Sequence, residues 1–372
     1  MELIVLKTNL KEGIAALGKI GSENASLPIL KNCLIETQEN KIKFSVTNLE
    51  VAISSVIPAK VVKDGSITVP LSILSSIINN LESERVSLET KVNNLVIKTE
   101  NYQAKIQGTK KEEFPIIPKI GNESEYLEIE SGLLKDGLLS IINASQGSAI
   151  RPELGGILFD YQVNIIKFAA TDSFRLAEKT IDENQYKTNI EQKLKTIIPL
   201  KTIQELVRVM SEKDDEKIQI YFDQSQVLFR TDKFELVSRV INGEFPDYQP
   251  IIPKETVIEV VVNREQLVSA LKLTGSFSDK MNEVRMIIKD GVKNIELFSS
   301  NPILGENQYL IPAKIKGDSI EIVFNWKFLF DGMKSITTEN ITIGLNGDNK
   351  PAIIRPMNAK DYFYIIMPIN NT

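Results

Sequence analysis

The chain has 372 residues, of which 42% are hydrophobic and 25% charged, with a formal net charge of −5 and no histidine. This length predicts two or three soluble domains, and the lack of histidine excludes catalytic pairs built on that residue and most zinc sites. The single cysteine, Cys33, excludes a disulfide within the chain. No apolar run reaches membrane-spanning length and no signal peptide is recognisable, so we expect a cytoplasmic protein with no membrane partner.

In chain order, the first element is an alternating strand that runs into a helix, and the same combination returns twice. The three copies occupy residues 1–20, 125–145 and 256–277. The dipeptide Phe-Pro precedes the second and third copies, at Phe114 and 131 residues later at Phe245. Alternation indicates strands and i, i+3, i+4 spacing indicates helices. Recurrence at this distance indicates a domain that is repeated three times.

The segments between these starts also follow one order. A strand pair comes first, then a strand that enters a second helix, and then two closing strands. The strand-to-helix segments are 67–81, 196–210 and 320–333. The sequence therefore predicts an α+β fold of three tandem copies, each with two helices on antiparallel sheets, in domains 1–121, 122–253 and 254–372.

No phosphate-binding glycine motif is present, so we expect no enzymatic activity and no cofactor or metal. Two alternatives stay open from the residues alone. One is a metal-dependent hydrolase that uses carboxylates such as Asp172 and Glu178. The other is a repeat scaffold that binds peptides but no DNA.

Five strings carry a resemblance to a known family: LPILKNCLIE, TNLE, ATDSFRLA, FPDY followed by IIP, and the terminal YIIMPI. In this order they resemble the bacterial sliding clamp, the β subunit of DNA polymerase III, over the whole chain. The resemblance implies a head-to-tail homodimer that closes into a ring of six domains, with helices around the hole. It also implies sequence-independent binding of double-stranded DNA, and a clamp loader, polymerase subunits and repair proteins as partners.

A ring that slides on DNA needs cations on its inner helices. The expected helices 9–20, 71–81, 131–145, 200–213, 263–277 and 325–335 together carry a net +4, which leaves −9 for the rest of the chain. Lys201 and Arg208 lie two helical turns apart, and the resemblance implies that they and Arg151 contact DNA. Asn24 stands where relatives often carry a basic residue.

The resemblance also implies a hydrophobic groove that binds short linear peptides of the partners. Thr171, Asp172 and Ser173 suit a turn, and Arg175 has two possible roles: it hydrogen-bonds a peptide, or it pairs with a nearby acid at a domain seam. The groove residues implied by the resemblance are Leu154, Thr171, Phe174, Arg175, Leu176, Pro246, Ile251, Ile365, Met367, Pro368 and Ile369. Pro250 and Asn370 depart from relatives at the rim, which leaves the peptide preference open.

The resemblance implies a dimer interface between the first and third domains. We expect the edge strand around Tyr102–Ile106 to pair with the third domain near Phe277. Ile106 and Phe277 are the residues assigned to this interface.

Overall fold

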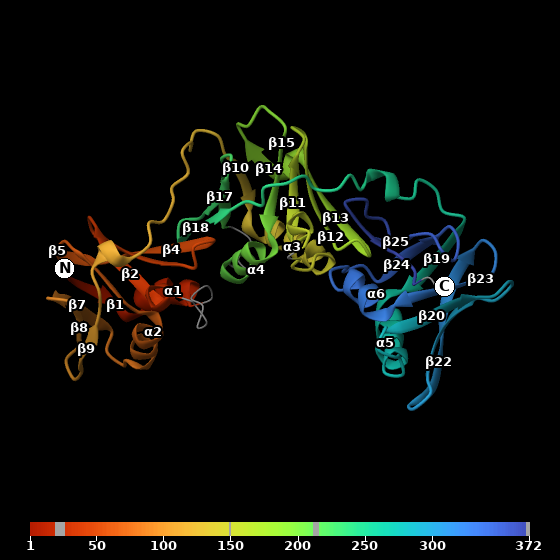
Figure 1. Ribbon diagram of the computed structural model, residues 1–372, viewed down its shortest axis with the longest axis horizontal. Helices are drawn as coiled ribbons and strands as arrows, with labels where there is room; N and C mark the ends of the chain where they lie inside the picture. Colours follow the sequence, from red (N-terminus) through yellow and green to blue (C-terminus); the bar gives the residue numbers. More distant parts are fainter. Residues whose placement is uncertain (19–26, 149, 211–215, 370–372) are drawn as a thin grey trace. The chain divides into compact units, whose positions relative to one another are not determined.

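The computed structural model describes residues 1–18, 27–148, 150–210 and 216–369 (Figure 1). The chain divides into two compact units. The first unit comprises Met1–Gly132, Tyr186–Ile190 and Gln204–Val240, and the second comprises Leu133–Gln185, Glu191–Ile203 and Ile241–Thr372. No helix in the described ranges combines the length and the apolar content needed to cross a membrane.

Two antiparallel sheets form the first unit within the described residues. The five-stranded sheet has the order β5 (Lys60–Lys63), β1 (Glu2–Leu6), β7 (Arg85–Lys91), β8 (Asn94–Lys98), β9 (Gln103–Gln107). The nine-stranded sheet has the order β14 (Tyr186–Thr188), β10 (Leu127–Glu130), β16 (Lys217–Phe222), β17 (Gln226–Arg230), β18 (Phe234–Arg239), β4 (Val51–Pro58), β3 (Lys41–Thr47), β2 (Asn32–Gln38), β6 (Ser66–Pro70).

One antiparallel sheet of twelve strands runs through the described part of the second unit. Its order is β15 (Leu194–Pro199), β11 (Gly156–Tyr161), β12 (Ile165–Thr171), β13 (Arg175–Asp182), β26 (Tyr362–Ile366), β25 (Ala352–Pro356), β24 (Asn340–Leu345), β19 (Ile258–Asn263), β22 (Gly305–Lys316), β21 (Asn294–Asn301), β20 (Glu283–Ile288), β23 (Ile320–Asn325).

The six helices expected from the sequence are all present among the described residues, with small shifts at their ends. They are α1 (Lys7–Leu17), α2 (Leu71–Asn80), α3 (Ser131–Ile141), α4 (Leu200–Val209), α5 (Arg264–Gly275) and α6 (Trp326–Met333). Figure 1 shows α1 beside α2 in the first unit and α5 beside α6 in the second. The segment Pro28–Lys31 forms a 3-10 turn that begins with Pro28, because proline fixes φ for a first turn.

The helices are amphipathic, and each buries one face. In α1 the buried residues are Leu10, Gly13, Ile14 and Leu17, which follow the i, i+3, i+4 period. Asparagine starts the last two helices: the side chain of Asn263 accepts from the Gln266 amide at 3.1 Å and that of Asn325 from the Lys327 amide at 3.0 Å. These caps satisfy donors that a helix start leaves open.

Helix α6 lies unusually close to β26, and Gly332 makes this approach possible. A Cβ atom at Gly332 would lie 2.5 Å from the Tyr364 ring. The Tyr364 hydroxyl donates to the Phe328 carbonyl at 2.9 Å, and the Tyr362 hydroxyl donates to the Gly332 carbonyl at 3.2 Å. The two tyrosines of β26 therefore attach α6 to the strand that borders the candidate site.

Candidate functional site

The turn between β12 and β13 is shaped by its own side chains. The Thr171 hydroxyl donates to the Arg175 carbonyl at 2.7 Å, and Asp172 Oδ1 accepts from the Phe174 and Arg175 amides at 3.0 and 3.1 Å. Ser173 has a φ of 77°, a backbone conformation uncommon for residues other than glycine. The polar turn predicted from Thr171, Asp172 and Ser173 is confirmed, and it leaves the Phe174 side chain 63% exposed.

Arg175 follows this turn and is buried, with 5% of its surface exposed. Its Nε donates to Asp172 Oδ2 at 2.9 Å, its Nη1 donates to Asp331 Oδ2 of α6 at 2.6 Å, and its guanidinium carbon lies 4.1 Å from the centre of the Phe328 ring. Burial alone would lower the pKa of Arg175, but Tyr364, Asp331 and Asp172 outweigh that effect and raise it. Of the two roles considered, pairing with a nearby acid is observed. Hydrogen bonding to a peptide stays a prediction.

A groove of about 170 Å³ opens beside this turn in the second unit. Its lining comprises Arg151, Leu154, Thr171, Ser173, Arg175, Leu176, Pro246, Asp247, Tyr248, Ile251, Ile365 and Met367. Eight of the eleven residues implied by the resemblance are in this lining, and Phe174, Pro368 and Ile369 are not. Phe174 nevertheless adjoins it, because its carbonyl accepts from the Met367 amide at 2.8 Å.

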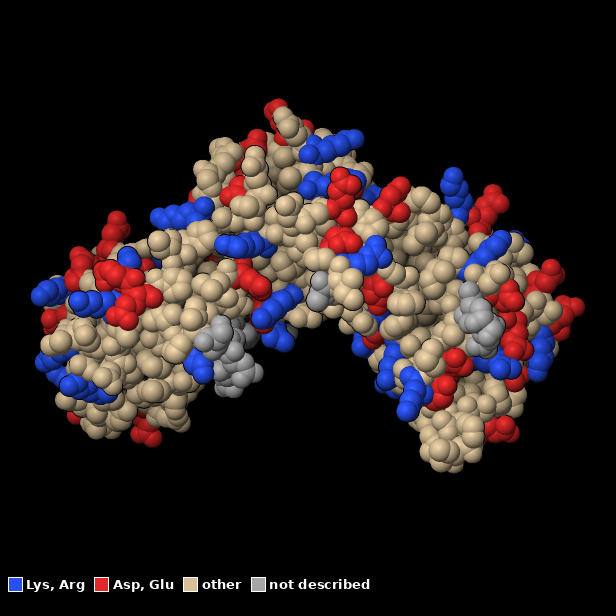
Figure 2. Space-filling model, viewed as in Figure 1, with Lys and Arg blue, Asp and Glu red and all other residues tan. Residues whose placement is uncertain are grey.

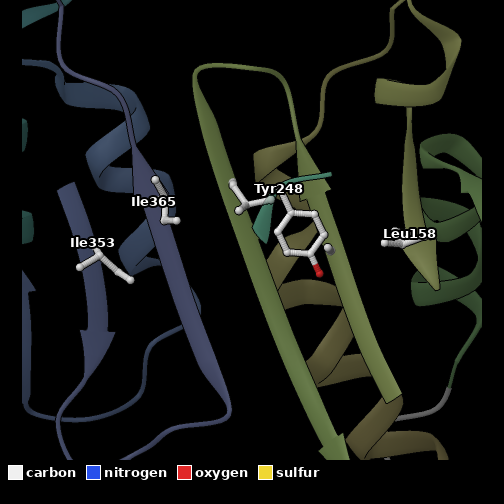
Figure 3. Close-up of a cluster of buried hydrophobic side chains, with 6 residues drawn as sticks. Leu158, Tyr248, Ile353 and Ile365 are labelled. Carbon is white, nitrogen blue, oxygen red and sulfur yellow. The ribbon is translucent and has the colours of Figure 1, made fainter. Parts of the chain in front are cut away.

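The floor of the groove is an apolar row that crosses five strands of the sheet. The buried strand residues that form it are Leu158, Ala169, Leu176, Ile353 and Ile365, and Tyr248 of the linker packs against them. Leu176 and Ile365 line the groove directly. Leu158 pairs with Ala169, and Leu176 pairs with Ile365, which in turn pairs with Ile353. Between β12 and β13 the row steps diagonally, because Ala169 pairs with Glu178 and Leu176 with Thr171. In the view of Figure 3, Tyr248 lies between Leu158 and Ile365. Such a floor suits apolar anchors of a ligand.

Four lining residues were not in the groove set that the resemblance implies: Arg151, which was assigned to DNA, and Ser173, Asp247 and Tyr248. Asp247 and Tyr248 belong to the FPDY string that carried the resemblance, so their position after Pro246 was the available signal. Asn370 lies outside the described residues. Pro250 lies in the 3-10 turn Gln249–Ile251 beside the groove.

The cations considered for DNA lie on exposed surfaces. On α4, Ile203, Leu206 and Val207 are buried, whereas Lys201 and Arg208 are exposed. Arg208 Nη1 is 3.1 Å from Glu205 Oε1. This amphipathic arrangement agrees with the predicted outward position of both cations. Arg151, by contrast, lines the groove, and its Nε lies 3.3 Å from Glu153 Oε1.

The described helices have a slight positive charge. With the bounds of the structure, they contain eight basic and five acidic residues, a net +3. On the face drawn in Figure 2, basic and acidic side chains are intermixed over both units. That face therefore offers no broad surface of one sign to a polyanion.

The residues assigned to the dimer interface have different exposures. β9 is an edge strand of its sheet, as expected for the segment around Tyr102–Ile106. The Ile106 side chain is only 4% exposed and packs inside the first unit, so this residue can offer its backbone, not its side chain, to a partner. Phe277 follows α5 and is half-buried.

The carboxylates considered for metal-dependent hydrolysis have other partners. The Asp172 carboxylate accepts from backbone amides of its own turn and from Arg175 Nε. Glu178 Oε2 accepts from the Tyr248 hydroxyl at 2.6 Å, and Glu178 Oε1 lies 3.3 Å from Lys167 Nζ. Among the described residues, no three of the residue types that ligate metals cluster together. The hydrolase alternative has no support.

Three domain models of one protein family match successive parts of the chain. Models of the DNA polymerase III beta subunit match in order: the N-terminal domain at residues 1–118, the central domain at 128–247 and the C-terminal domain at 249–370. The beta sliding clamp of Synechococcus elongatus is 28% identical over 375 residues, and that of Bacillus subtilis is 25% identical over 382, each match covering 99% of both chains.

Solved structures agree in fold. The beta subunit from Thermotoga maritima superposes with a TM-score of 0.90 at 26% identity, and the Bacillus subtilis sliding clamp with a TM-score of 0.94 at 24% identity, each over 100% of both chains. The predicted fold of three tandem clamp domains is confirmed. The chain belongs to the DNA polymerase III beta subunit family.

Proposed function

We propose that this protein is a sliding clamp, a processivity factor that closes around duplex DNA and tethers a replicative polymerase to it. The observation that carries the proposal is the match of all three family domains, in order, over residues 1–370. The described chain contains no cluster of metal-ligating residues, and nothing in the proposed role requires catalysis or a cofactor. The protein would act in the cytoplasm, where the bacterial chromosome lies.

The proposed contact with DNA is electrostatic and independent of base sequence. Lys201 and Arg208 project from α4 and are suited to reach phosphates. A net charge of only +3 over the described helices favours weak contacts, which a protein that must move along DNA requires. Base-edge contacts would instead hold it at particular sequences.

The proposed tether is the groove. An extended peptide would place apolar anchors on Leu176 and Ile365, while Met367 adapts its shape to different anchors. Ordering a flexible segment offsets part of the contact energy, so we expect affinities of about 1 μM. Weak binding allows the clamp loader, polymerase subunits and repair proteins to exchange on one clamp.

The proposed assembly is a head-to-tail homodimer. The unpaired backbone of β9 offers one edge, and a second chain would cover it with the region that includes Phe277. Pairing edge to edge satisfies backbone groups that an isolated chain leaves exposed to aggregation.

The experiment that tests the function is topological. The protein is loaded on a nicked circular duplex by a clamp loader and the circle is then cut once. Retention on the circle with release after cutting supports encirclement. Equal retention on a linear duplex with free ends contradicts it, and failure to be retained on any DNA favours a peptide-binding scaffold.

A further inference from the structure

One side of the groove consists of a linker and not of a sheet strand. Residues 245–251 include the lining residues Pro246 and Ile251. The backbone hydrogen bonds of this linker are local: the Ile251 amide donates to the Tyr248 carbonyl at 3.2 Å and the Ile252 amide to the Gln249 carbonyl at 3.3 Å. Local backbone hydrogen bonds do not attach such a segment to the sheet, so side-chain contacts are needed to hold it at a fixed distance from the strands.

Tyr248 provides a contact of this kind, beside Phe245 and Ile252, which also pack against the apolar residues. Its ring is buried, with 6% exposed, and packs on the apolar floor between strands and linker (Figure 3). Phe245 packs edge-on against the Tyr248 ring, with ring centres 6.0 Å apart. The Tyr248 hydroxyl donates to Glu178 Oε2 at 2.6 Å. The linker is thus tied to β13, the strand that also carries Arg175 and Leu176.

The acceptor of this hydrogen bond is itself held in place. Glu178 is 5% exposed, and its other carboxylate oxygen lies 3.3 Å from Lys167 Nζ on β12. Burial, followed by the contact with Glu178, raises the pKa of Tyr248, so the phenol stays protonated and remains a donor at physiological pH. A hydrogen bond from a neutral donor to a buried carboxylate is stronger than a neutral pair.

The repeat provides an internal comparison. The run from Lys43 to Ser54 has the same length and pattern as the run from Lys167 to Glu178, so Ser54 stands at the position of Glu178. Ser54 hydrogen-bonds Ser45 instead of the linker, at 2.8 Å.

The linker of the first unit differs at the matching place as well. Counted from Phe-Pro, Ile117 stands where Tyr248 stands in the second linker. Next to this linker, an ion pair joins Lys111 to the sheet: Lys111 Nζ lies 2.5 Å from Glu36 Oε1 of β2, and the lysine side chain is 51% exposed. The fold therefore does not require a tyrosine–glutamate bond, and its presence is particular to the linker that lines the groove.

We propose that Tyr248 is a positioning residue for peptide binding, and that its hydrogen bond to Glu178 holds linker residues 245–251 at the distance from β13 and β26 that a bound peptide needs. This inference rests on the proposed role of the groove. Loss of the bond frees the linker to move away from the floor, so the groove is formed in a smaller fraction of molecules. The apparent affinity for the peptide then falls in proportion to the fraction of molecules in which the groove is formed.

The test uses the full-length protein and a short fluorescein-labelled peptide from the C-terminal end of a replicative polymerase subunit of the same organism. Tyr248→Phe removes only the hydroxyl. The matched control is Tyr221→Phe, because Tyr221 is equally buried at 6% exposed and donates to Gln219 at 2.8 Å in the first unit. We expect about tenfold weaker binding for Tyr248→Phe, the loss of one charge-assisted hydrogen bond, and a change below about twofold for the control.

Two further measurements separate positioning from general loss of structure. Hydrogen exchange of the protein's own backbone amides in the linker segment 244–252 should become faster in Tyr248→Phe. It should not become faster in the control. Adding Glu178→Gln to Tyr248→Phe should weaken binding less than it does in the wild-type background, because Tyr248→Phe has already removed the hydrogen bond that Glu178→Gln weakens.

Each outcome has a distinct meaning. Tyr248→Phe that binds like wild type, or a control that loses as much affinity, overturns the positioning role. A wild-type protein that does not bind the peptide refutes the proposed groove instead. In that case, unchanged exchange in 244–252 of Tyr248→Phe would show separately that the hydrogen bond does not hold the linker.

Discussion

Replacing Arg175 with alanine should lower the free energy of unfolding of the second unit, and this loss of stability does not depend on any ligand. The Arg175 side chain is 4% exposed, and its guanidinium bridges Asp172 of the turn and Asp331 of α6, whose side chains are 8% and 19% exposed. Removing one member of a buried ionic network costs about 3–5 kcal/mol, since the remaining charges stay buried without it. Both carboxylates keep other donors: Asp172 retains two backbone amides, and Asp331 Oδ1 retains Lys334 Nζ at 2.6 Å. We therefore expect the low end, about 3 kcal/mol.

The single tryptophan makes this loss measurable where it occurs. Trp326 is the first residue of α6, and its indole donates to the Ser278 hydroxyl at 3.1 Å. Urea unfolding followed by tryptophan fluorescence therefore reports on the helix that Arg175 holds. This is useful because a chain with two compact units need not unfold in one step.

The matched control is Arg285→Ala in the same unit. Arg285 Nη1 lies 2.9 Å from Glu321 Oε1, but the side chains are 44% and 53% exposed. An exposed pair contributes about 0–1 kcal/mol. If Arg175→Ala unfolds at the same urea concentration as Arg285→Ala, the reasoning that the buried network stabilises α6 is wrong. A loss of peptide affinity without loss of stability would instead assign Arg175 to direct contact with the ligand.

Three other predictions follow from single features. The double variant Lys201→Ala, Arg208→Ala should make the negative slope of log K against log salt for duplex DNA shallower by about 2, because each side chain contributes one phosphate contact. Peptide affinity should stay unchanged and serves as the control. An unchanged slope would show that neither residue contacts DNA. The Cys33 thiol is buried and its pKa is raised to about 12 by burial, so it should stay protonated and react with a thiol reagent only in urea; rapid labelling of the native protein contradicts this. Gly332→Ala should cost about 1–3 kcal/mol in urea unfolding, because the new Cβ would lie 2.5 Å from the Tyr364 ring; wild-type stability would mean that α6 shifts freely.

The number of compact units differs from the number of repeats for a physical reason. Strands of neighbouring repeats pair with each other: β18 with β4 in register from Phe234–Ser55 to Ser238–Val51, and β13 with β26 from Arg175–Ile366 to Lys179–Tyr362. Contacts at such a seam are as dense as those inside one repeat. Sequence similarity counts repeats, whereas contacts in space count packed bodies, so the two need not agree.

Local features were predictable and long-range partners were not. The helices and the turn at Thr171–Ser173 follow from periodicity and side-chain type, which act over a few residues. The partner of Arg175 is Asp331, 156 positions away, and nothing in either local sequence indicates the pairing. The same holds for Tyr248 and Glu178, which are 70 positions apart. The resemblance therefore located the groove, but one of the two roles considered for Arg175 pointed its side chain toward a ligand.

The two linkers show how one scaffold can give surfaces of different character. Beneath the first linker lies a larger hollow of about 790 Å³, formed by the strands that match those of the groove. Ion pairs cross it, with Lys43 3.1 Å from Glu235 and Arg230 2.8 Å from Glu123. An apolar anchor placed there would have to remove water from these charges, and the loss of their solvation opposes binding. The floor of the groove is an apolar row, and the charged residues Arg151, Arg175 and Asp247 lie elsewhere in its lining, so an anchor on the floor meets less of this opposition. The difference in charge, and not a difference in fold, favours the second unit for an apolar peptide.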